Sequence, residues 1–267
     1  MKSNFYQKRS YFLLYLLVQF SCLSALTQDL ASYEKKWVVQ GSDTLPHRVL
    51  LPLNYDSAKQ YPLVFFLHGA GERGRDNEKQ LVHGAKLFLG DEARKKFPAI
   101  VVFPQCAATD YWSNVLRLHD AKGKRQFHFL PDGTATTNMI MLQQLITYVI
   151  ATYPVQKEQV YVGGLSMGGM GTYEVVRRMP GIFAAAFAIC GGANPETAKK
   201  LKKVNWWIFH GAKDDVVPPE ASQVIVNALK KAGADVKFTL YPNANHNSWD
   251  PVFAEKDLLP WLFAQHK

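Results

Sequence analysis

The chain contains few cysteines and shows no sign of a segmented or repetitive build. Its 267 residues include only Cys22, Cys106 and Cys190, which are too few for a disulfide scaffold. Internal repeats and a linker rich in proline, glycine and serine are also absent. Charged residues make up 20% of the chain and apolar residues 48%, which excludes a disordered, collagenous or coiled-coil protein. One large globular domain fits this length best.

Residues 1–27 are typical of a secretory signal peptide. Three basic residues come without any acid, an apolar run follows at residues 11–20, and small or polar residues come after it. A membrane-spanning helix needs about 20 apolar residues, whereas this run has ten, so we expect cleavage and no stable membrane insertion. The mature protein is then expected to be secreted or periplasmic. A lipid anchor on Cys22 is the open alternative.

The predicted signal peptide also changes the charge of the protein. The whole chain has a formal net charge of +9, but three of its basic residues lie in residues 1–27, so the mature chain retains +6. Basic runs at 94–96, 122–125 and 199–203 are typical of solvated surfaces, and none is interleaved with aromatic residues as a single-strand nucleic-acid groove would be. We therefore predict no nucleic-acid partner.

Strand and helix patterns alternate along the mature chain. Short runs that are apolar throughout indicate strands covered on both faces of a mostly parallel sheet. These runs lie at 63–67, 100–103, 160–163, 184–189 and 206–209. Further elements are an outer strand at 237–241, antiparallel edge strands at 37–39 and 47–51, and helices over 139–149 and 224–229. The pattern predicts a three-layer α/β/α sandwich with ligands beyond the carboxyl ends of its strands.

The motif that carries the chemistry is Gly164-Leu165-Ser166-Met167-Gly168, which matches G-x-S-x-G. It follows the strand predicted at 160–163 and precedes a helical stretch over 172–178. A turn this sharp between strand and helix forces strained backbone angles on the serine and leaves room only for glycine at its flanks. We therefore predict that Ser166 is an exposed nucleophile.

A serine nucleophile needs a histidine base that is oriented by a carboxylate, and the chain places both residue types after strands. Asp214 and Asp215 come after the strand at 206–209, and His246 comes after the strand at 237–241. The order serine, aspartate, histidine is that of the α/β-hydrolases. The spacing alone leaves open which of the two aspartates is the acid.

An oxyanion hole is expected after the strand at 63–67. The segment 67–71 reads Leu-His-Gly-Ala-Gly, and in this fold such a loop aims a backbone N–H at the developing oxyanion. The predicted donors are the backbone N–H groups of Ala70 and Met167. His68 is expected to orient the loop rather than to act as a second base.

Several motifs together point to one family. They are Leu45-Pro46-His47-Arg48, Tyr61-Pro62-Leu63, His68-Gly69-Ala70-Gly71-Glu72-Arg73-Gly74, Pro104-Gln105-Cys106, Gly164-Leu165-Ser166-Met167-Gly168-Gly169, His210-Gly211-Ala212-Lys213-Asp214 and His246-Asn247-Ser248-Trp249. Residues 45–264 thereby resemble the secreted esterase and predicted peptidase branch of the α/β-hydrolase superfamily, similar to feruloyl and acetylxylan esterases and polyhydroxybutyrate depolymerases. The resemblance selects Asp214, since the acid of H-G-x-x-D stands four positions after the histidine. His47 departs from the family, where an aromatic residue is usual.

The residues and the resemblance imply an extracytoplasmic serine carboxylic-ester hydrolase that works through an acyl-enzyme intermediate. Its expected substrates are small-molecule or polysaccharide esters with carbohydrate-linked, small acyl or phenolic groups. A serine peptidase of the prolyl-oligopeptidase-like type is the alternative. Neither an H-E-x-x-H motif nor a dinucleotide-type glycine fingerprint occurs, so we expect no metal and no cofactor.

One catalytic domain is expected over 28–267, with a cap-like loop insertion at 106–137. The length of that insertion suggests a wall of the substrate pocket. Gln105, Trp112 and Trp249 are the candidate substrate contacts, although both tryptophans could instead pack the loop. The oligomeric state is left open by the sequence.

Overall fold

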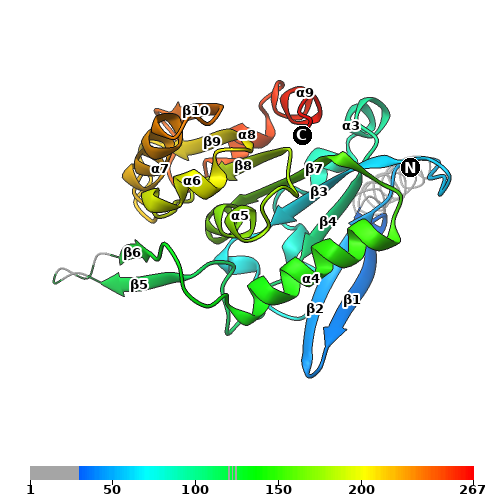
Figure 1. Ribbon diagram of the computed structural model, residues 1–267, viewed down its shortest axis with the longest axis horizontal. Coiled ribbons are helices and arrows are strands. Elements are labelled where there is room, and N and C mark those ends of the chain that lie inside the picture. The colour runs from blue at the N-terminus through cyan, green and yellow to red at the C-terminus, as the bar shows by residue number, and fades with distance from the viewer. Residues whose placement is uncertain (1–29, 120, 122, 124) are drawn as a thin grey trace, which may run out of the picture.

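A computed structural model describes residues 30–119, 121, 123 and 125–267 of the chain (Figure 1). The predicted signal peptide at 1–27 lies outside these residues. Within them, none of the helices combines the length and the hydrophobicity that a membrane span requires.

An eight-stranded sheet forms the centre of the molecule, in the order β1-β2-β4-β3-β7-β8-β9-β10. Its strands are β1 (Glu34–Gln40), β2 (Asp43–Leu50), β3 (Tyr61–Leu67), β4 (Ile100–Pro104), β7 (Val155–Leu165), β8 (Ala185–Ile189), β9 (Asn205–Gly211) and β10 (Val236–Tyr241). β2 pairs antiparallel with both β1 and β4, whereas the pairs from β4 to β10 are parallel. The predicted sandwich with a mostly parallel sheet is confirmed.

The central strands are apolar at successive positions because both of their faces are covered. Val64, Phe65 and Phe66 in β3 are all inaccessible to solvent. Phe65 packs into the hydrophobic cluster on one face of the sheet, and Phe66 packs into the cluster on the other. Because successive side chains of a strand point to opposite faces, a strand buried on both sides shows no alternation of polar and apolar residues. This is the pattern on which the strand predictions rest.

Helices cover both faces of the sheet (Figure 1). One face carries α4 (Thr137–Thr152), α5 (Met167–Arg178), α6 (Ala198–Leu201) and α7 (Glu220–Lys231), and the other carries α2 (Ala85–Leu89), α3 (Asp91–Lys96), α8 (Trp249–Phe253) and α9 (Leu258–Phe263). Among the described helices α4 is the longest, and it begins after Thr136, whose side chain accepts a hydrogen bond from the N–H of Met139. Its predicted apolar stripe is buried against the sheet.

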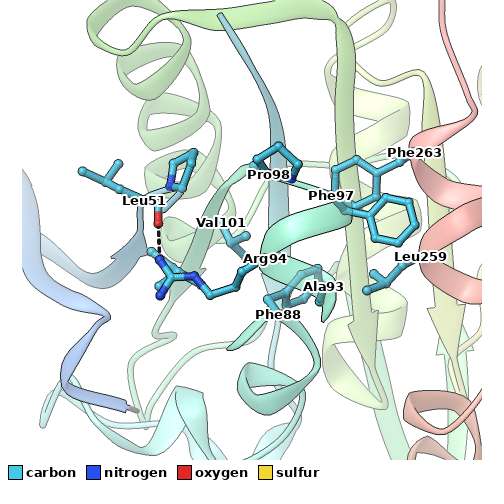
Figure 2. A pocket seen from close by; sticks show the side chains of 12 residues that line it. Leu51, Phe88, Ala93, Arg94, Phe97, Pro98, Val101, Leu259 and Phe263 are labelled. Atoms are coloured by element: carbon cyan, nitrogen blue, oxygen red, sulfur yellow. Dashed lines mark hydrogen bonds between the residues drawn. The ribbon is translucent and has the colours of Figure 1, made fainter. Parts of the chain in front are cut away.

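On the second face, α3 is held between the end of β2 and α9 (Figure 2). The guanidinium of Arg94 donates to the carbonyl of Leu51 at 2.7 Å, and the ring of Phe97 stacks on that of Phe263 with centroids 5.1 Å apart. The cavity that remains is about 10 Å³, enough for about one water molecule. This cavity is therefore too small for a substrate.

Residues 106–137, predicted as a cap-like insertion, contain a β-hairpin that the sequence patterns did not indicate. Strands β5 (Val115–His119) and β6 (Arg125–Phe129) pair antiparallel and extend away from the main sheet (Figure 1). At the base of the hairpin, the Asp110 carboxylate accepts hydrogen bonds from the backbone and side-chain amides of Asn138 at the start of α4. The hairpin is thereby fixed to the main domain.

Candidate active site

Ser166 lies at the turn between β7 and α5, in a backbone conformation that few residues adopt. Its φ is 53° and its ψ is −117°, in a region that normally favours glycine. The N–H of Ser166 donates to the carbonyl of Ile189 at 2.8 Å, and its own carbonyl accepts from the N–H of Met170 at 3.0 Å. Backbone bonds on both sides therefore hold the strained turn in place.

The glycines around Ser166 are required by close backbone approach. A Cβ atom on Gly168 would overlap the carbonyl of Leu67, and one on Gly164 would lie 2.5 Å from the carbonyl oxygen of Gly168. Real Cβ contacts are essentially never shorter than 3.0 Å. The helix that follows the serine can therefore approach β3 and β7 only because these positions lack side chains.

Three of the predicted side chains come together in one line of hydrogen bonds. His246 Nε2 lies 3.0 Å from Ser166 Oγ, and His246 Nδ1 lies 2.8 Å from Asp214 Oδ2. An ionised carboxylate only accepts, so Nδ1 carries the ring proton and Nε2 is free to accept the serine hydroxyl. The Asp214 side chain is fully buried, whereas the His246 side chain is 19% exposed. Asp215, the rejected alternative, is exposed in the same loop.

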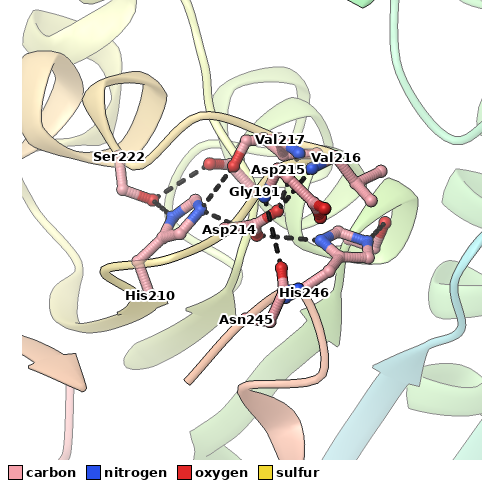
Figure 3. Close-up of polar contacts among 10 residues, drawn as sticks. Gly191, His210, Asp214, Asp215, Val216, Val217, Ser222, Asn245 and His246 are labelled. Atoms are coloured by element: carbon pink, nitrogen blue, oxygen red, sulfur yellow. Dashed lines mark hydrogen bonds and ion pairs between the residues drawn. The ribbon is translucent and has the colours of Figure 1, made fainter. Parts of the chain in front are cut away.

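Asp214 is held by four N–H groups. Its Oδ1 accepts from the backbone N–H groups of Val216 and Val217, both at 2.9 Å. Its Oδ2 accepts from His246 and from a second histidine, His210, whose Nε2 is 3.1 Å away. Figure 3 shows the two imidazole rings on opposite sides of this carboxylate. Both oxygens are thus fixed in position before any ligand binds.

His210 was quoted as part of a motif, but its contact with the acid was not predicted. Its Nε2 also lies 2.9 Å from the carbonyl of Val217, so this nitrogen faces two acceptors and must carry a proton. Its Nδ1 lies 2.7 Å from the hydroxyl of Ser222. His210 is fully buried on β9, four residues before Asp214. The signal available in the sequence was the histidine of H-G-x-x-D itself.

These bonds determine the charge of Asp214. Burial alone would raise its pKa, but the hydrogen bonds from His210, His246 and the N–H of Val217 outweigh burial and lower the pKa well below its usual range. Asp214 is therefore an anion at neutral pH. Its charge can stabilise a protonated His246 during a reaction.

The two predicted oxyanion donors lie at helix starts. Ala70 is the first residue of the 3-10 helix η1 (Ala70–Glu72), and Met167 is the first residue of α5. The first N–H groups of a helix have no partner inside the helix, so both remain available to an anion. The ideal Cβ position on Gly69 lies 3.7 Å from Ser166 Cβ, which places this loop directly beside the serine. The structure thus brings both donors to the same end of the sheet.

The side chain of His68 holds the loop before Ala70 through two hydrogen bonds to backbone groups. This side chain is fully buried, its Nδ1 donates to the carbonyl of Gly69 at 2.6 Å, and its Nε2 accepts from the N–H of Cys106 at 2.9 Å. Burial lowers the pKa of His68 to about 4, so the ring is neutral at pH 7. Both nitrogens are occupied by backbone groups, which fits the predicted orienting role.

Two of the predicted substrate contacts do not reach the surface. Gln105 is completely buried: its amide accepts from the N–H of Asn77 and donates to the Glu72 carbonyl and to Asp76. Trp112 is also completely buried, edge-on to the ring of His68 at 5.4 Å. The expectation that these side chains contact substrate is wrong, because each is turned inward to pack or tether the oxyanion loop. For Trp112, the alternative stated above, that the side chain packs the loop, agrees with its burial.

Trp249, the third candidate, lies beside His246. Its ring is edge-on to that of His246, with centroids 5.5 Å apart, and it is only partly buried. The Trp249 ring also lies 5.1 Å from that of His83. Trp249 can therefore both support His246 and meet a ligand at Ser166.

A free thiol, that of Cys190, also lies beside Asp214 and His246. Cys190 Sγ, an Asp214 oxygen and a His246 ring nitrogen lie within 4.8 Å of one another, a spacing that a metal ion could bridge. Burial raises the pKa of the Cys190 thiol, and the other two groups are already hydrogen-bonded to each other. The geometry therefore favours a hydrogen-bonded acid and base over a metal centre.

Comparison with known proteins identifies the family. Residues 54–255 match the phospholipase/carboxylesterase family, which covers more than half of the chain. The chain belongs to this family. It has the α/β-hydrolase fold, as the sequence motifs predicted.

Proteins described as esterases are similar to this chain. A bifunctional acetylxylan esterase/xylanase from Neocallimastix patriciarum is 32% identical over 130 residues, which are 45% of this chain and 19% of that protein. The aligned part is thus about a fifth of that relative. A solved thermostable esterase is 30% identical with a TM-score of 0.80, over 90% of this chain and 64% of the other.

More distant structures share the fold alone. A CE1 ferulic acid esterase from Anaeromyces mucronatus, solved with ferulic acid, has a TM-score of 0.63 at 16% identity and covers 87% of this chain and 90% of its own. An acylaminoacyl peptidase from Pyrococcus horikoshii has a TM-score of 0.60 at 14% identity, over 90% of this chain and 43% of its own. The same fold therefore carries both ester and peptide chemistry.

Proposed function

We propose that Ser166, His246 and Asp214 are the catalytic triad of a serine esterase. One observation carries the proposal: two consecutive hydrogen bonds, of 3.0 Å and 2.8 Å, join the serine hydroxyl to the imidazole and the imidazole to the carboxylate. These distances are within the reach that a nucleophile and its base require. Membership of the carboxylesterase family supports the same assignment.

The proposed reaction has two steps. Ser166 Oγ attacks the ester carbonyl carbon while His246 Nε2 takes the hydroxyl proton, and His246 then gives that proton to the leaving alcohol. Water, deprotonated by His246, attacks the acyl-serine and releases the acid. The N–H groups of Ala70 and Met167 stabilise the oxyanion of both tetrahedral intermediates. Ala70 and Met167 begin η1 and α5, where the N–H groups have no partner inside the helix, and this supports the assignment.

His210 acts in this proposal as a positioning residue for Asp214. Its Nε2–H and the two backbone N–H groups fill the acceptor sites of the carboxylate that His246 does not use. Asp214 can then rotate only by breaking several bonds at once. The lone pair that faces His246 Nδ1 consequently stays aligned through both steps.

The proposed substrates are carbohydrate-linked esters or small acyl or phenolic esters. Relatives described as an acetylxylan esterase and a ferulic acid esterase support this choice. Trp249, partly buried beside His246, is placed to contact the acyl or alcohol group of such a substrate. The second candidate is a serine peptidase, which the shared fold of the acylaminoacyl peptidase favours.

The proposed place of action is outside the cytoplasm, with residues 28–267 forming one catalytic domain. The order of basic, apolar and small residues within 1–27 supports export and cleavage. Mass spectrometry of the N-terminus of the exported protein tests this. We expect a mature chain that starts after Ser24 or Thr27; a diacylglycerol-modified Cys22 would instead establish the lipid-anchored alternative.

The triad is tested with a chain that begins at residue 28. Substrates are p-nitrophenyl acetate and butyrate, methyl ferulate, acetylated xylan and aminoacyl p-nitroanilides. We expect ester hydrolysis that Ser166→Ala abolishes while the thermal unfolding midpoint stays unchanged. Ester hydrolysis that persists in Ser166→Ala would contradict the assignment. Cleavage of the anilides in preference to every ester would support the peptidase instead.

A further inference from the structure

A groove of about 570 Å³ lies between the β5–β6 hairpin and the start of α7. One wall is formed by residues 125–129 of β6, and the opposite wall is formed by 193–195 and by residues of 218–224. Its volume is within the range of small-ligand sites. None of the predicted site residues lines it. The groove is therefore a second concave surface that the proposed triad does not use.

The groove lies at the same end of the sheet as the triad. Residues 193–195 follow β8, whose last residue, Ile189, accepts the N–H of Ser166. Pro218 follows Asp214 by four residues in the loop after β9. The two loops that position the nucleophile and the acid thus continue directly into the walls of the groove. In an open α/β sheet, ligands bind at this carboxyl end of the strands.

A chain of contacts also joins the groove to the oxyanion loop. Arg73 donates from Nε to the carbonyl of Ala70 at 3.0 Å, and its guanidinium lies 5.9 Å from the centre of the Tyr111 ring. The guanidinium of Arg117 lies 4.6 Å from the same ring. Arg117 stands directly opposite Phe127 in the hairpin, so both side chains are on one face. That face therefore runs from the proposed oxyanion site to the groove.

The lining of the groove combines aromatic rings with polar groups of both signs. The rings of Phe127 and Phe129 are nearly parallel, at 13°, with centroids 6.3 Å apart. Arg125, His128 and Glu220 supply donors and acceptors around them. A sugar unit has the matching surface, because its C–H face packs on an aromatic ring while its hydroxyl groups bond to polar side chains. A long acyl chain would instead require an apolar wall throughout.

Positive charge follows the same path. The guanidinium groups of Arg73 and Arg117 lie 5.9 Å and 4.6 Å from the centre of the Tyr111 ring, and Arg125 lies in the lining of the groove. In the part of the chain that the structure describes, no carboxylate forms an ion pair with any of them. Guanidinium groups bind carboxylates through paired N–H donors. The path is thus complementary to an acidic chain.

We propose that this groove binds the sugar chain of an acidic polysaccharide ester, one that carries uronate carboxylates, while the ester group occupies the triad. The proposal rests on the proposed esterase function and names its substrate class. Phe127 packs against a sugar ring, and Arg125, in the lining of the groove, binds a uronate carboxylate. Arg117 lies outside the lining but on the same face of the hairpin as Phe127, and binds that carboxylate from beside the groove. The alcohol part of the substrate is then recognised away from the reacting atoms.

The test compares two acetylated xylo-oligosaccharides of equal length that differ only in a glucuronate side group. The wild-type chain should have about fivefold higher kcat/KM for the acidic oligosaccharide, because two partly exposed ion pairs form only with it. Arg117→Gln together with Arg125→Gln should bring that ratio close to one. Phe127→Ala should lower kcat/KM for both oligosaccharides by about tenfold relative to p-nitrophenyl acetate.

Matched controls separate these effects from damage to the hairpin. Leu118→Ala alters an exposed side chain on β5 that is absent from the lining of the groove, and Lys231→Gln removes a positive charge at the far end of α7. Both variants should keep the wild-type ratio. A wild-type ratio near one would overturn the proposal, and so would an equal loss in Leu118→Ala and Phe127→Ala.

A binding measurement tests the groove without relying on catalysis. Calorimetry of Ser166→Ala with the deacetylated acidic oligosaccharide should show binding that weakens as salt is added. Absence of that binding would overturn the proposal that the groove binds the sugar chain, even if esters are hydrolysed. Binding that weakens when Arg117→Gln and Arg125→Gln are combined would support the groove as a binding site. Failure of the chain to hydrolyse any ester would refute the proposed esterase function but not this binding.

Discussion

Replacing Asp214 with asparagine changes one atom, and the four N–H groups around it leave no good orientation for the new amide. With its NH₂ group toward the histidines, the amide meets the N–H donors of His246 and His210. With its NH₂ group toward the backbone, it meets the N–H donors of Val216 and Val217. In either orientation, the NH₂ group of the asparagine faces two N–H donors and finds no acceptor among them. The backbone N–H groups cannot move their protons, so we expect the amide oxygen to face them.

That orientation determines the size of the effect. His246 must then carry its proton on Nε2 instead of Nδ1. A protonated Nε2 can no longer accept the Ser166 hydroxyl proton. A histidine base in the wrong tautomer lowers kcat by about 10⁴, or about 5.5 kcal/mol of activation free energy. The fold should lose only about 1 to 3 kcal/mol, because one charged hydrogen-bond acceptor is lost.

The assay is kcat for p-nitrophenyl acetate at pH 8, together with the urea midpoint of unfolding for the same samples. Asp215→Asn is the matched control, because the side chain is exposed in the same loop and should leave kcat within about twofold of wild type. A folded Asp214→Asn variant that kept a tenth of wild-type kcat would refute the tautomer argument. The reverse ranking of the two variants would show that Asp215 is the acid.

Three further outcomes follow from the loops around Ser166. Gly168→Ala places a methyl group against the carbonyl of Leu67, so the free energy of unfolding should fall by about 3 kcal/mol or more in urea; a wild-type midpoint would show that α5 can shift freely. Gln105→Leu removes the tether between Asn77, Glu72 and Asp76, so kcat for p-nitrophenyl acetate should fall about tenfold with little change in KM, whereas an unchanged kcat would mean that the oxyanion loop holds itself. Burial opposes ionisation of Asp76, but the N–H groups of Lys79 and Glu78 and the Gln105 amide lower its pKa to about 2. A lowered pKa stabilises the fold above the unfolded value of about 4, and this stabilisation is lost as pH falls toward 2. The difference in urea midpoint between wild type and Asp76→Asn should therefore be largest above pH 4 and become small near pH 2. A difference that grows on acidification would contradict this reasoning.

The sequence predicted the main sheet because burial on both faces leaves a signal in every residue of a strand. β3 and β8 are apolar at nearly every position, and such a continuous apolar run can be recognised in the sequence. The β5–β6 hairpin left no such signal. Leu116 and Leu118 are about half exposed and alternate with Arg117 and His119, so the segment resembles a polar loop. Its conformation depends on cross-strand pairing with residues 125–129, which is not a local property.

The same limit applies to the site. Ser166, Asp214 and His246 each follow a strand, and parallel strands bring their carboxyl ends to one edge, so their meeting was predictable. Gln105 also follows a strand, β4, yet its side chain turns inward to tether the loop at Asn77. Which way a residue turns after a strand depends on contacts with segments distant in sequence. For the same reason, the contact of His210 with Asp214 was visible only in three dimensions.

Backbone strain is concentrated where the proposed chemistry takes place. In the described ranges, four non-glycine residues have a positive φ, of which Asn54 and Asn77 are of a type that tolerates it. The other two, Ser166 at 53° and Cys190 at 43°, follow the neighbouring strands β7 and β8. Each such position costs about 1 to 3 kcal/mol, which the buried sheet beneath them offsets.

The strain has a direct geometric effect. It turns Ser166 Oγ toward His246 and Cys190 Sγ toward the same imidazole and carboxylate. Ser166 is held by its N–H bond to Ile189, and Cys190 by its N–H bond to the carbonyl of Phe209, so neither turn can relax without breaking a bond between strand ends. Ser166 Oγ therefore meets His246 Nε2 before any substrate arrives. This alignment is built into the backbone, which is why it follows from a sheet and a glycine-flanked turn rather than from flexible side chains.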